Sequence, residues 1–325
     1  MVKGLVSVII CCFNGKEFIA SCFNSLLAQT YKRLEIIFID DGSTDGSYDL
    51  ALGYSEQLLK EGMNLLCLKQ SNQGVGFACA NGLSLANGEY ICVFDVDDYL
   101  YPESLQKRVQ FLDAHSDYAV VRTNGYKFSQ NGQKHLFVSD NQEIHKEDIF
   151  EDLLLGRTNN WPGSYLVRAN ALWNVFPDRS IPGSRYGQNL QILLSASWNN
   201  KAGFINEPLM EYRFNPRSFT NQDTNFEASF KRFLGFWLIR LTILSKLGIT
   251  SSDLLNKLKV TYGKILMDLC LSHSNREKYM AVYRSIVPVQ PLEPLYKYHY
   301  YRFSGKMLTA LVFRGINYLQ SHSKR

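Results

Sequence analysis

The sequence lacks the features of several protein classes. It has no uninterrupted apolar run of about 18 residues, so we expect no membrane-spanning helix. The apolar stretch over residues 2–13 has no small-residue cleavage site, so we expect no signal peptide. There is no C-x-x-C pair, and the 7 cysteines lie mostly in apolar runs. This cysteine usage predicts buried, reduced thiols in a cytoplasmic protein.

The net charge is small but unevenly distributed. The 35 basic and 30 acidic side chains leave a formal charge of +5, too little to indicate a nucleic-acid-binding protein. Residues 226–325 contain 16 Lys and Arg against 5 Asp and Glu, whereas residues 1–225 contain 19 against 25. The length of 325 residues also fits roughly two domains at about 150 residues each. The chain is therefore expected to divide into an acidic N-terminal part and a basic C-terminal part.

Short β-branched runs alternate with helical patterns over the first hundred residues. The predicted strands are 5–11, 35–39, 65–68 and 90–94, and the predicted helices are one after residue 14, one at 47–59 and one at 75–86. Asn14 and Glu17 have the spacing of a capping box at the first helix. This alternation predicts βαβ units and a mostly parallel sheet.

The later pattern is less regular. It predicts strands at 120–123 and 125–128 and helices at 146–155 and 187–198. From residue 226, apolar residues follow the helical period.

Polar clusters follow three of the predicted strands. They are Phe13-Asn14, Asp40-Asp41 and the segment Asp95–Asp98. Ligands of open α/β sheets bind at the carboxyl ends of the strands, so these clusters are expected to form one site. Three carboxylates within four residues repel one another unless a hard divalent cation such as Mn²⁺ or Mg²⁺ binds them.

Six ordered segments carry a family resemblance. They are VSVIICCFN (6–14), SLLAQTY (25–31), EIIFIDDGSTDGS (35–47), NQG (72–74), GL (82–83) and GEYICVFDVDD (88–98). Together they resemble the nucleotide-sugar-binding half of the family 2 glycosyltransferases, which have the Rossmann-like GT-A fold. The resemblance implies a GT-A domain over 1–225, with a nucleotide-sugar half at 1–115 and an acceptor half at 116–225, followed by a basic α-helical region at 226–325.

The resemblance also implies roles for individual residues. Its nucleotide-binding positions are Cys11, Phe13, Asn14, Asp41, Asp95 and Val96, and its metal ligands are Asp97 and Asp95. The matching acceptor or diphosphate positions are Trp161, Gln188, Asn189, Arg213 and Arg217. Relatives carry an Arg in the segment after Asn72-Gln73-Gly74, and this chain has none there. Arg213 and Arg217 are candidates to supply that positive charge.

One departure from the family concerns the general base. Inverting relatives place a Glu-Asp pair before an apolar helix, and this chain has Gln188-Asn189 instead. A carboxamide cannot accept a proton near pH 7, so Asn189 cannot be the base. Asp178 is a weak candidate for that role, and the base stays unassigned.

The resemblance implies an enzyme that transfers a sugar from a nucleotide-diphosphate sugar, with UDP as the expected nucleotide. The expected acceptor is a hydroxyl, in some relatives lipid-linked, in polysaccharide, glycolipid or glycoprotein synthesis. The expected reaction is inverting and metal-dependent. The alternative suggested by Asn189 is a non-catalytic nucleotide-sugar-binding subunit of another transferase. A nucleotidyltransferase is disfavoured, because the loop after the first strand is neither glycine-rich nor basic.

The basic C-terminal region carries a second apolar stripe, formed by Phe303, Met307, Leu308, Leu311 and Val312. Basic amphipathic helices with a free apolar face lie in the membrane interface. The sequence leaves two alternatives open: peripheral contact with the inner face of a membrane, or packing and homodimerisation through these helices.

Overall fold

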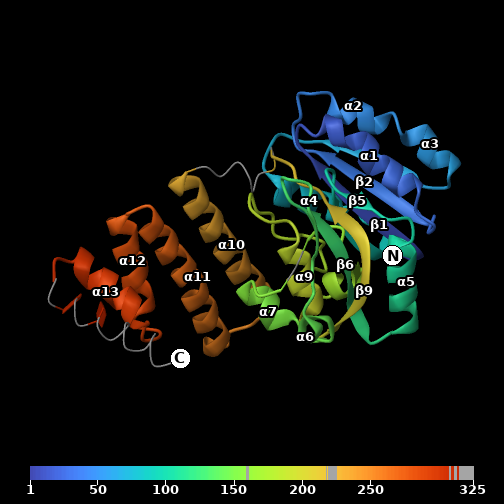
Figure 1. Cartoon of the computed structure of the whole chain (residues 1–325). Helices are drawn as coiled ribbons and strands as arrows, with labels where there is room; N and C mark the ends of the chain where they lie inside the picture. The colour runs from blue at the N-terminus through green and yellow to red at the C-terminus, as the bar shows by residue number, and fades with distance from the viewer. Residues whose placement is uncertain (159–160, 217, 219–224, 307–308, 311–312, 315–325) are drawn as a thin grey trace. The chain divides into compact units, whose positions relative to one another are not determined.

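The computed structural model describes residues 1–158, 161–216, 218, 225–306, 309–310 and 313–314. The described residues of 1–218 and 242–249 form one compact unit, and those of 219–241 and 250–325 form a second. The first unit contains the β-sheet, and the second is helical (Figure 1).

The front of the sheet has the predicted alternation of strands and helices. Its strands are β1 (Val2–Cys12), β2 (Leu34–Asp40), β3 (Asn64–Lys69) and β4 (Gly88–Asp95), which pair in parallel in the order β3-β2-β1-β4. The intervening helices are α1 (Lys16–Leu27), α2 (Ser47–Leu52), α3 (Ser55–Lys60) and α4 (Val75–Ser84). The single helix predicted over 47–59 is two helices, because α2 ends at Gly53.

The predicted capping box at Asn14 is wrong. Gly15 is the N-cap residue of α1, and no side chain caps that end. Asn14 has a φ of 50°, and its Oδ1 accepts a hydrogen bond from the Thr44 N–H at 2.9 Å. The side chain is therefore used to join the loops that follow β1 and β2.

The second half of the sheet is mixed. Its elements are β5 (Tyr99–Leu100), α5 (Ser104–Ala114), β6 (Tyr118–Phe128), β7 (Lys134–Leu136), α6 (Asn141–Ile144), α7 (Phe150–Leu155), β8 (Tyr165–Arg168), α8 (Ala169–Trp173), α9 (Leu190–Ser197) and β9 (Lys201–Tyr212). The strand order continues β4-β8-β6-β9-β5, with β7 beside β6. Strand β8 is antiparallel to both β4 and β6, so the sheet is parallel only in part.

Two predicted boundaries in this half differ from the structure. The strands predicted at 120–123 and 125–128 are one strand, β6. Gly125 lies within this strand. A Cβ at Gly125 would lie only 2.5 Å from the Phe137 ring, so the ring packs against the glycine. The helix predicted at 146–155 begins only at Phe150.

A buried arginine holds the start of β8 in place. Arg108 on α5 is fully buried, and its guanidinium donates to the Gly163 and Tyr165 carbonyls at 2.8 and 2.9 Å. Buried charges are retained when every donor has such a partner. Arg108 thus fixes the segment that enters β8 against the core.

The second unit consists of α10 (Phe226–Lys246, whose last residues belong to the first unit), α11 (Ser252–Ser272), α12 (Arg276–Ile286) and α13 (Pro294–Phe303). Its buried core includes Met267, Cys270 and Tyr279, and Phe226, Phe230 and Phe303 pack against that core. Apolar residues of both predicted stripes are therefore used inside the unit. Met307, Leu308, Leu311 and Val312 lie outside the described residues. None of the described helices is both long enough and apolar enough to cross a bilayer.

Candidate active site

The site lies at the carboxyl ends of three adjacent parallel strands. Cys11 of β1 pairs with Ile39 of β2 on one side and with Asp95 of β4 on the other. The three strands therefore end at the same level, as the sequence predicted. The loops that follow them meet at this edge of the sheet.

A cluster of three carboxylates follows β4. Asp95, Asp97 and Asp98 each offer an oxygen, and these atoms lie within 4.8 Å of one another. Asp98 is 1% exposed; its Oδ1 accepts a hydrogen bond from the Arg213 N–H at 3.0 Å. Its Oδ2 is buried and has no partner among the described residues. Asp97 Oδ2 accepts from Asn215 Nδ2 at 2.8 Å.

The electrostatics of this cluster favour a cation. Burial and the nearby Asp97 raise the pKa of Asp95 to about 7, although a hydrogen bond from Gln188 opposes the shift. Burial, Asp95 and Asp97 raise the pKa of Asp98 well above its usual value. Close carboxylates with an unpaired buried oxygen are the donor set that Mg²⁺ or Mn²⁺ takes. The residues present therefore fit a divalent metal.

Asp41 is the centre of the side that the sequence predicts for the nucleotide. Its Oδ1 accepts from Gln70 Nε2 at 2.7 Å and from the Gln73 N–H at 2.9 Å, and its Oδ2 accepts from the Gly74 N–H at 2.8 Å. The carboxylate thus orders the loop before α4, and Oδ2, with one bond, retains capacity for a ligand donor.

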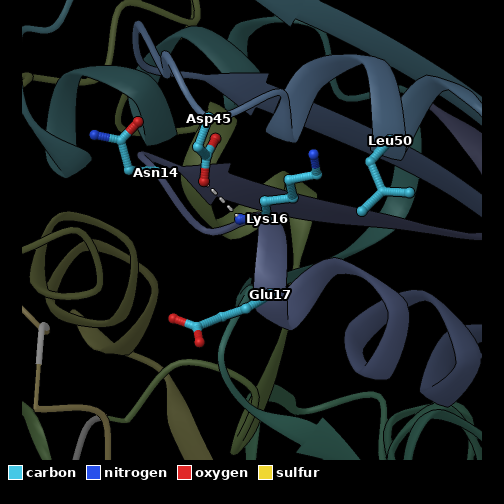
Figure 2. Close-up of a pocket in the computed structure, with 5 residues that line it drawn as sticks. All are labelled: Asn14, Lys16, Glu17, Asp45 and Leu50. Carbon is cyan, nitrogen blue, oxygen red and sulfur yellow. Dashed lines mark hydrogen bonds between the residues drawn. The ribbon is translucent and has the colours of Figure 1, made fainter.

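The loop after β1 forms the other wall. Phe13 is 53% exposed, whereas Cys11 and Val96 are buried. A hydrogen bond with Cys79 and burial raise the pKa of the Cys11 thiol well above its usual value, so this thiol stays protonated. Asn14 also helps to line a shallow pocket of about 480 Å³ (Figure 2). The remaining residues that line this pocket are Lys16, Glu17, Asp45 and Leu50.

The side that the sequence predicts for the acceptor contains the amide pair. Gln188 donates from Nε2 to Asp95 Oδ1, so the pair lies directly beside the carboxylate cluster. Asn189 Oδ1 accepts from the Tyr165 hydroxyl at 2.9 Å. Burial raises the pKa of Tyr165 well above its usual value, so this hydroxyl keeps the proton that it donates.

An aromatic group lies on the same side. The Trp161 ring is 4.0 Å from the Phe137 ring and 6.0 Å from the Tyr212 ring, measured between centroids. Burial, followed by Asp95, Asp98 and Asp97, raises the pKa of Tyr212, which places that tyrosine near the carboxylates. Trp161 is thus close to the site, in a partly buried aromatic cluster.

Comparison with known proteins identifies the family. Residues 7–176 match the family model described as glycosyl transferase family 2. The chain belongs to glycosyltransferase family 2. Glycosyltransferase GlyG of Streptococcus pneumoniae is 27% identical over 242 residues, which are 70% of this chain and 76% of GlyG.

Solved structures confirm the GT-A fold. S. aureus TarS 1–349 in complex with UDP-GlcNAc is similar with a TM-score of 0.66 at 17% identity, covering 98% of this chain and 92% of that one. The same fragment in complex with UDP gives a TM-score of 0.60 with the same coverage and identity. The chain is thus a glycosyltransferase with an α/β sheet of the GT-A type.

The resemblance implies two arginines for the diphosphate, and the structure describes only the first of them, Arg213. The Arg213 guanidinium donates to Glu211 Oε2 at 3.0 and 3.1 Å and to Ser21 Oγ at 2.6 Å, and it lies 4.9 Å from the Tyr99 ring centroid. The guanidinium therefore has partners within the protein, and the backbone N–H of Arg213 donates to Asp98. Arg217 lies outside the described residues.

Asp178 does not join the site. Its carboxylate accepts hydrogen bonds from the N–H and hydroxyl of Ser180, which lower its pKa. The next residue, Arg179, donates to the carbonyls of Ser84 and Ala86, at the C-terminal end of α4. The site is at the opposite end of this ten-residue helix, about 15 Å away.

Three residues of the site were not assigned a role from the sequence. Tyr212 and Asn215 belong to the Tyr212–Ser218 segment, in which the sequence pattern assigns a role only to the two arginines. Arg185 precedes the amide pair, and a Cβ added to Gly74 would lie 2.9 Å from its Cγ. No sequence pattern places Arg185 against the start of α4, because that contact depends on the loop between α8 and α9.

Proposed function

We propose that this glycosyltransferase transfers a sugar from a UDP-sugar to an acceptor oxygen with the help of a divalent metal. The observation that carries the proposal is the meeting of Asp41, the Asp95–Asp98 cluster and the Gln188–Asn189 pair at one sheet edge. Support for UDP comes from the complexes of TarS, which shares the fold.

Each group of residues in the site has its own proposed role. Asp41 and the loops after β1 and β2 hold the base, with the exposed Phe13 ring available for stacking. Asp97 and Asp95 would hold the metal, and Asp98 would orient the cluster through its bond with Arg213. A metal bound there supplies charge neutralisation for the departing diphosphate.

The proposed acceptor side adjoins the carboxylates that would hold the metal. Gln188 links it to Asp95, and Trp161 offers a partly buried ring beside Tyr212. An attack from this side, opposite the diphosphate, inverts the configuration at the anomeric carbon.

A thermal-shift panel tests donor and metal together. The wild-type protein is melted with UDP-GlcNAc, UDP-Glc, UDP-Gal and GDP-Man, each with and without Mn²⁺. A rise in Tm with at least one UDP-sugar, larger with Mn²⁺, supports the proposal. A rise in Tm with GDP-Man alone, or no rise in Tm with any of the nucleotide sugars, refutes the proposal.

The basic helical unit gives a second proposal, contact with an anionic membrane surface at the inner face. Three acidic residues of this unit are each paired with one lysine: Glu227 with Lys278, Asp253 with Lys257 and Glu293 with Lys264. Residues 226–325 therefore retain a large excess of positive charge. Each Lys or Arg near an anionic surface contributes about 1 kcal/mol.

Liposome co-sedimentation tests this second proposal. Binding to phosphatidylglycerol vesicles at low salt, lost at high salt and absent with phosphatidylcholine, supports membrane contact. Protein that stays in the supernatant under every condition refutes it. A dimer in light scattering would then assign the helices to self-association.

A further inference from the structure

The amide pair lies where a base would act, and it offers the opposite chemistry. Asn189 Oδ1 is occupied by the Tyr165 hydroxyl, which turns the amide nitrogen to the other side. Asn189 Nδ2 has no protein partner in the described part of the chain. An amide N–H₂ only donates hydrogen bonds. Asn189 therefore has a donor left for a ligand.

Among the described residues, the side-chain partners of the amide pair include no carboxylate outside the Asp95–Asp98 cluster. Among the described residues, the side chains that hydrogen-bond the side chains of Gln188 and Asn189 are those of Asp95 and Tyr165. Asp95 belongs to the carboxylate cluster that fits a cation, and the Tyr165 hydroxyl is buried and stays protonated. A neutral hydroxyl that attacks without a base reacts about 10² to 10⁴ times more slowly.

Asp95 lies on one side of the pair, and two groups that favour an anion adjoin the pair along the chain. Helix α9 begins directly after Asn189, with no acidic side chain in its first turn and no side-chain cap. Arg185, four residues earlier, is exposed and has no ion pair among the described residues. Free helix N–H groups and a guanidinium both favour an anion.

One oxygen of the pair is buried and unpaired, which leaves it available to a ligand. Gln188 is 7% exposed, and its Oε1 has no hydrogen-bond partner among the described residues. Its Nε2 is held by Asp95, which fixes Oε1 in place. An acceptor atom of this kind is suited to a hydroxyl of the transferred sugar, next to the attacking group.

We infer that the acceptor oxygen is already anionic and belongs to a phosphate monoester. The inference rests on the proposed function and narrows its acceptor from a hydroxyl to a phosphate. An oxygen lone pair of the phosphate dianion attacks the anomeric carbon, and the bond from that carbon to the UDP oxygen breaks. UDP leaves with the electron pair, a glycosyl phosphodiester forms, and no proton has to be removed. Asn189 and Arg185 orient the incoming phosphate.

The test compares matched acceptors with the wild-type protein, Mn²⁺ and the UDP-sugar that raises Tm most. Octyl phosphate and glycerol 3-phosphate are compared with octanol and octyl β-glucoside, and with no acceptor. UDP release is measured, and the product is identified by ³¹P NMR. We expect release with phosphates to exceed release with hydroxyl acceptors by about 10² or more. Rates should also rise with the second ionisation of the acceptor, near pH 6.

The two phosphates separate the possible sources. Preference for octyl phosphate assigns a lipid-linked acceptor, and preference for glycerol 3-phosphate assigns a soluble one. Faster release with octyl β-glucoside than with either phosphate overturns the inference and leaves the proposed function standing. No UDP release with any acceptor or with water overturns both.

Two variants of the site and one control variant make the test independent of a single measurement. Asn189→Asp replaces the donor by a carboxylate, which repels the phosphate and can act as a base. It should lower transfer to octyl phosphate at least tenfold and raise transfer to octyl β-glucoside. Asn170→Asp adds the same charge at an exposed position on α8 and should change neither rate. Arg185→Gln should raise the KM for octyl phosphate more than the KM for octyl β-glucoside; equal effects on both would contradict the assigned contact.

Discussion

The substitution Gly76→Ala tests how the loop before α9 is held against the site. A Cβ at Gly76 would lie 2.6 Å from the Gly187 carbonyl oxygen and closer still to the Ser184 oxygen. Both atoms are backbone, so neither can rotate away. To reach ordinary van der Waals distance the loop must retreat by about 1 Å. Gln188 follows immediately in the chain and would move away from Asp95.

The size of the effect follows from two opposing terms. Overpacking costs about 1–3 kcal/mol, and replacing glycine by alanine within a helix recovers up to about 1 kcal/mol. The free energy of unfolding should therefore fall by no more than about 3 kcal/mol. Displacement of catalytic groups by about 1 Å costs about 10²-fold in rate. The loss of UDP release should thus be far larger than the loss of stability.

Gly82→Ala is the matched control on the same helix. Its Cβ would lie 2.6 Å from Ile9 Cγ2, so it overpacks the core without touching the loop before α9. Thermal melts and UDP release are measured for both variants. Comparable losses of Tm, with a loss of UDP release confined to Gly76→Ala, are expected. Equal activity of the two variants would refute the role of the Gly76 contact.

Three further predictions concern the cluster and the amide. Asp97→Ala should abolish the Mn²⁺-dependent part of the UDP-sugar thermal shift while the fold persists in circular dichroism; a retained metal effect would contradict the metal assignment. The raised pKa of Asp95, about 7, means that the folded protein holds a proton that the unfolded chain releases near pH 4, so without metal this group makes stability fall from about pH 4 to 7. Because Mn²⁺ binds the ionised carboxylate, its effect on Tm should be larger at pH 8 than at pH 5, and an equal effect would count against the cluster as its site. Tyr165→Phe leaves Asn189 Oδ1 unpaired and should lower the free energy of unfolding by about 1–3 kcal/mol in urea titrations; a neutral result would show that the hydrogen bond is not formed.

The nucleotide half was predictable because its signals are local. Continuous apolar runs predicted the buried parallel strands β1, β2 and β4, and polar residues at their ends predicted the site. The carboxylates after β4 are neighbours in sequence, so their clustering required no long-range information. The GT-A fold followed from these segments and is confirmed.

The acceptor half was less predictable because its contacts are distant in sequence. The sequence around Arg213 does not indicate that its guanidinium donates a hydrogen bond to Ser21 or that its backbone N–H donates one to Asp98. The antiparallel placement of β8 likewise depends on pairing with β4 and β6. Asn14 was misread because its left-handed backbone directs the side chain to Thr44 and not to the helix.

The central claim is that this protein breaks the bond between a sugar and UDP. The most direct measurement is single-turnover UDP release from the UDP-sugar that raises Tm most, with Mn²⁺, octyl phosphate and enzyme in excess over the sugar nucleotide. Stoichiometric UDP and glycosyl phosphate, both lost in Asp97→Ala, are predicted. Tight binding of the UDP-sugar with no UDP formed, with or without acceptor, would contradict the claim and identify the protein as a nucleotide-sugar-binding subunit.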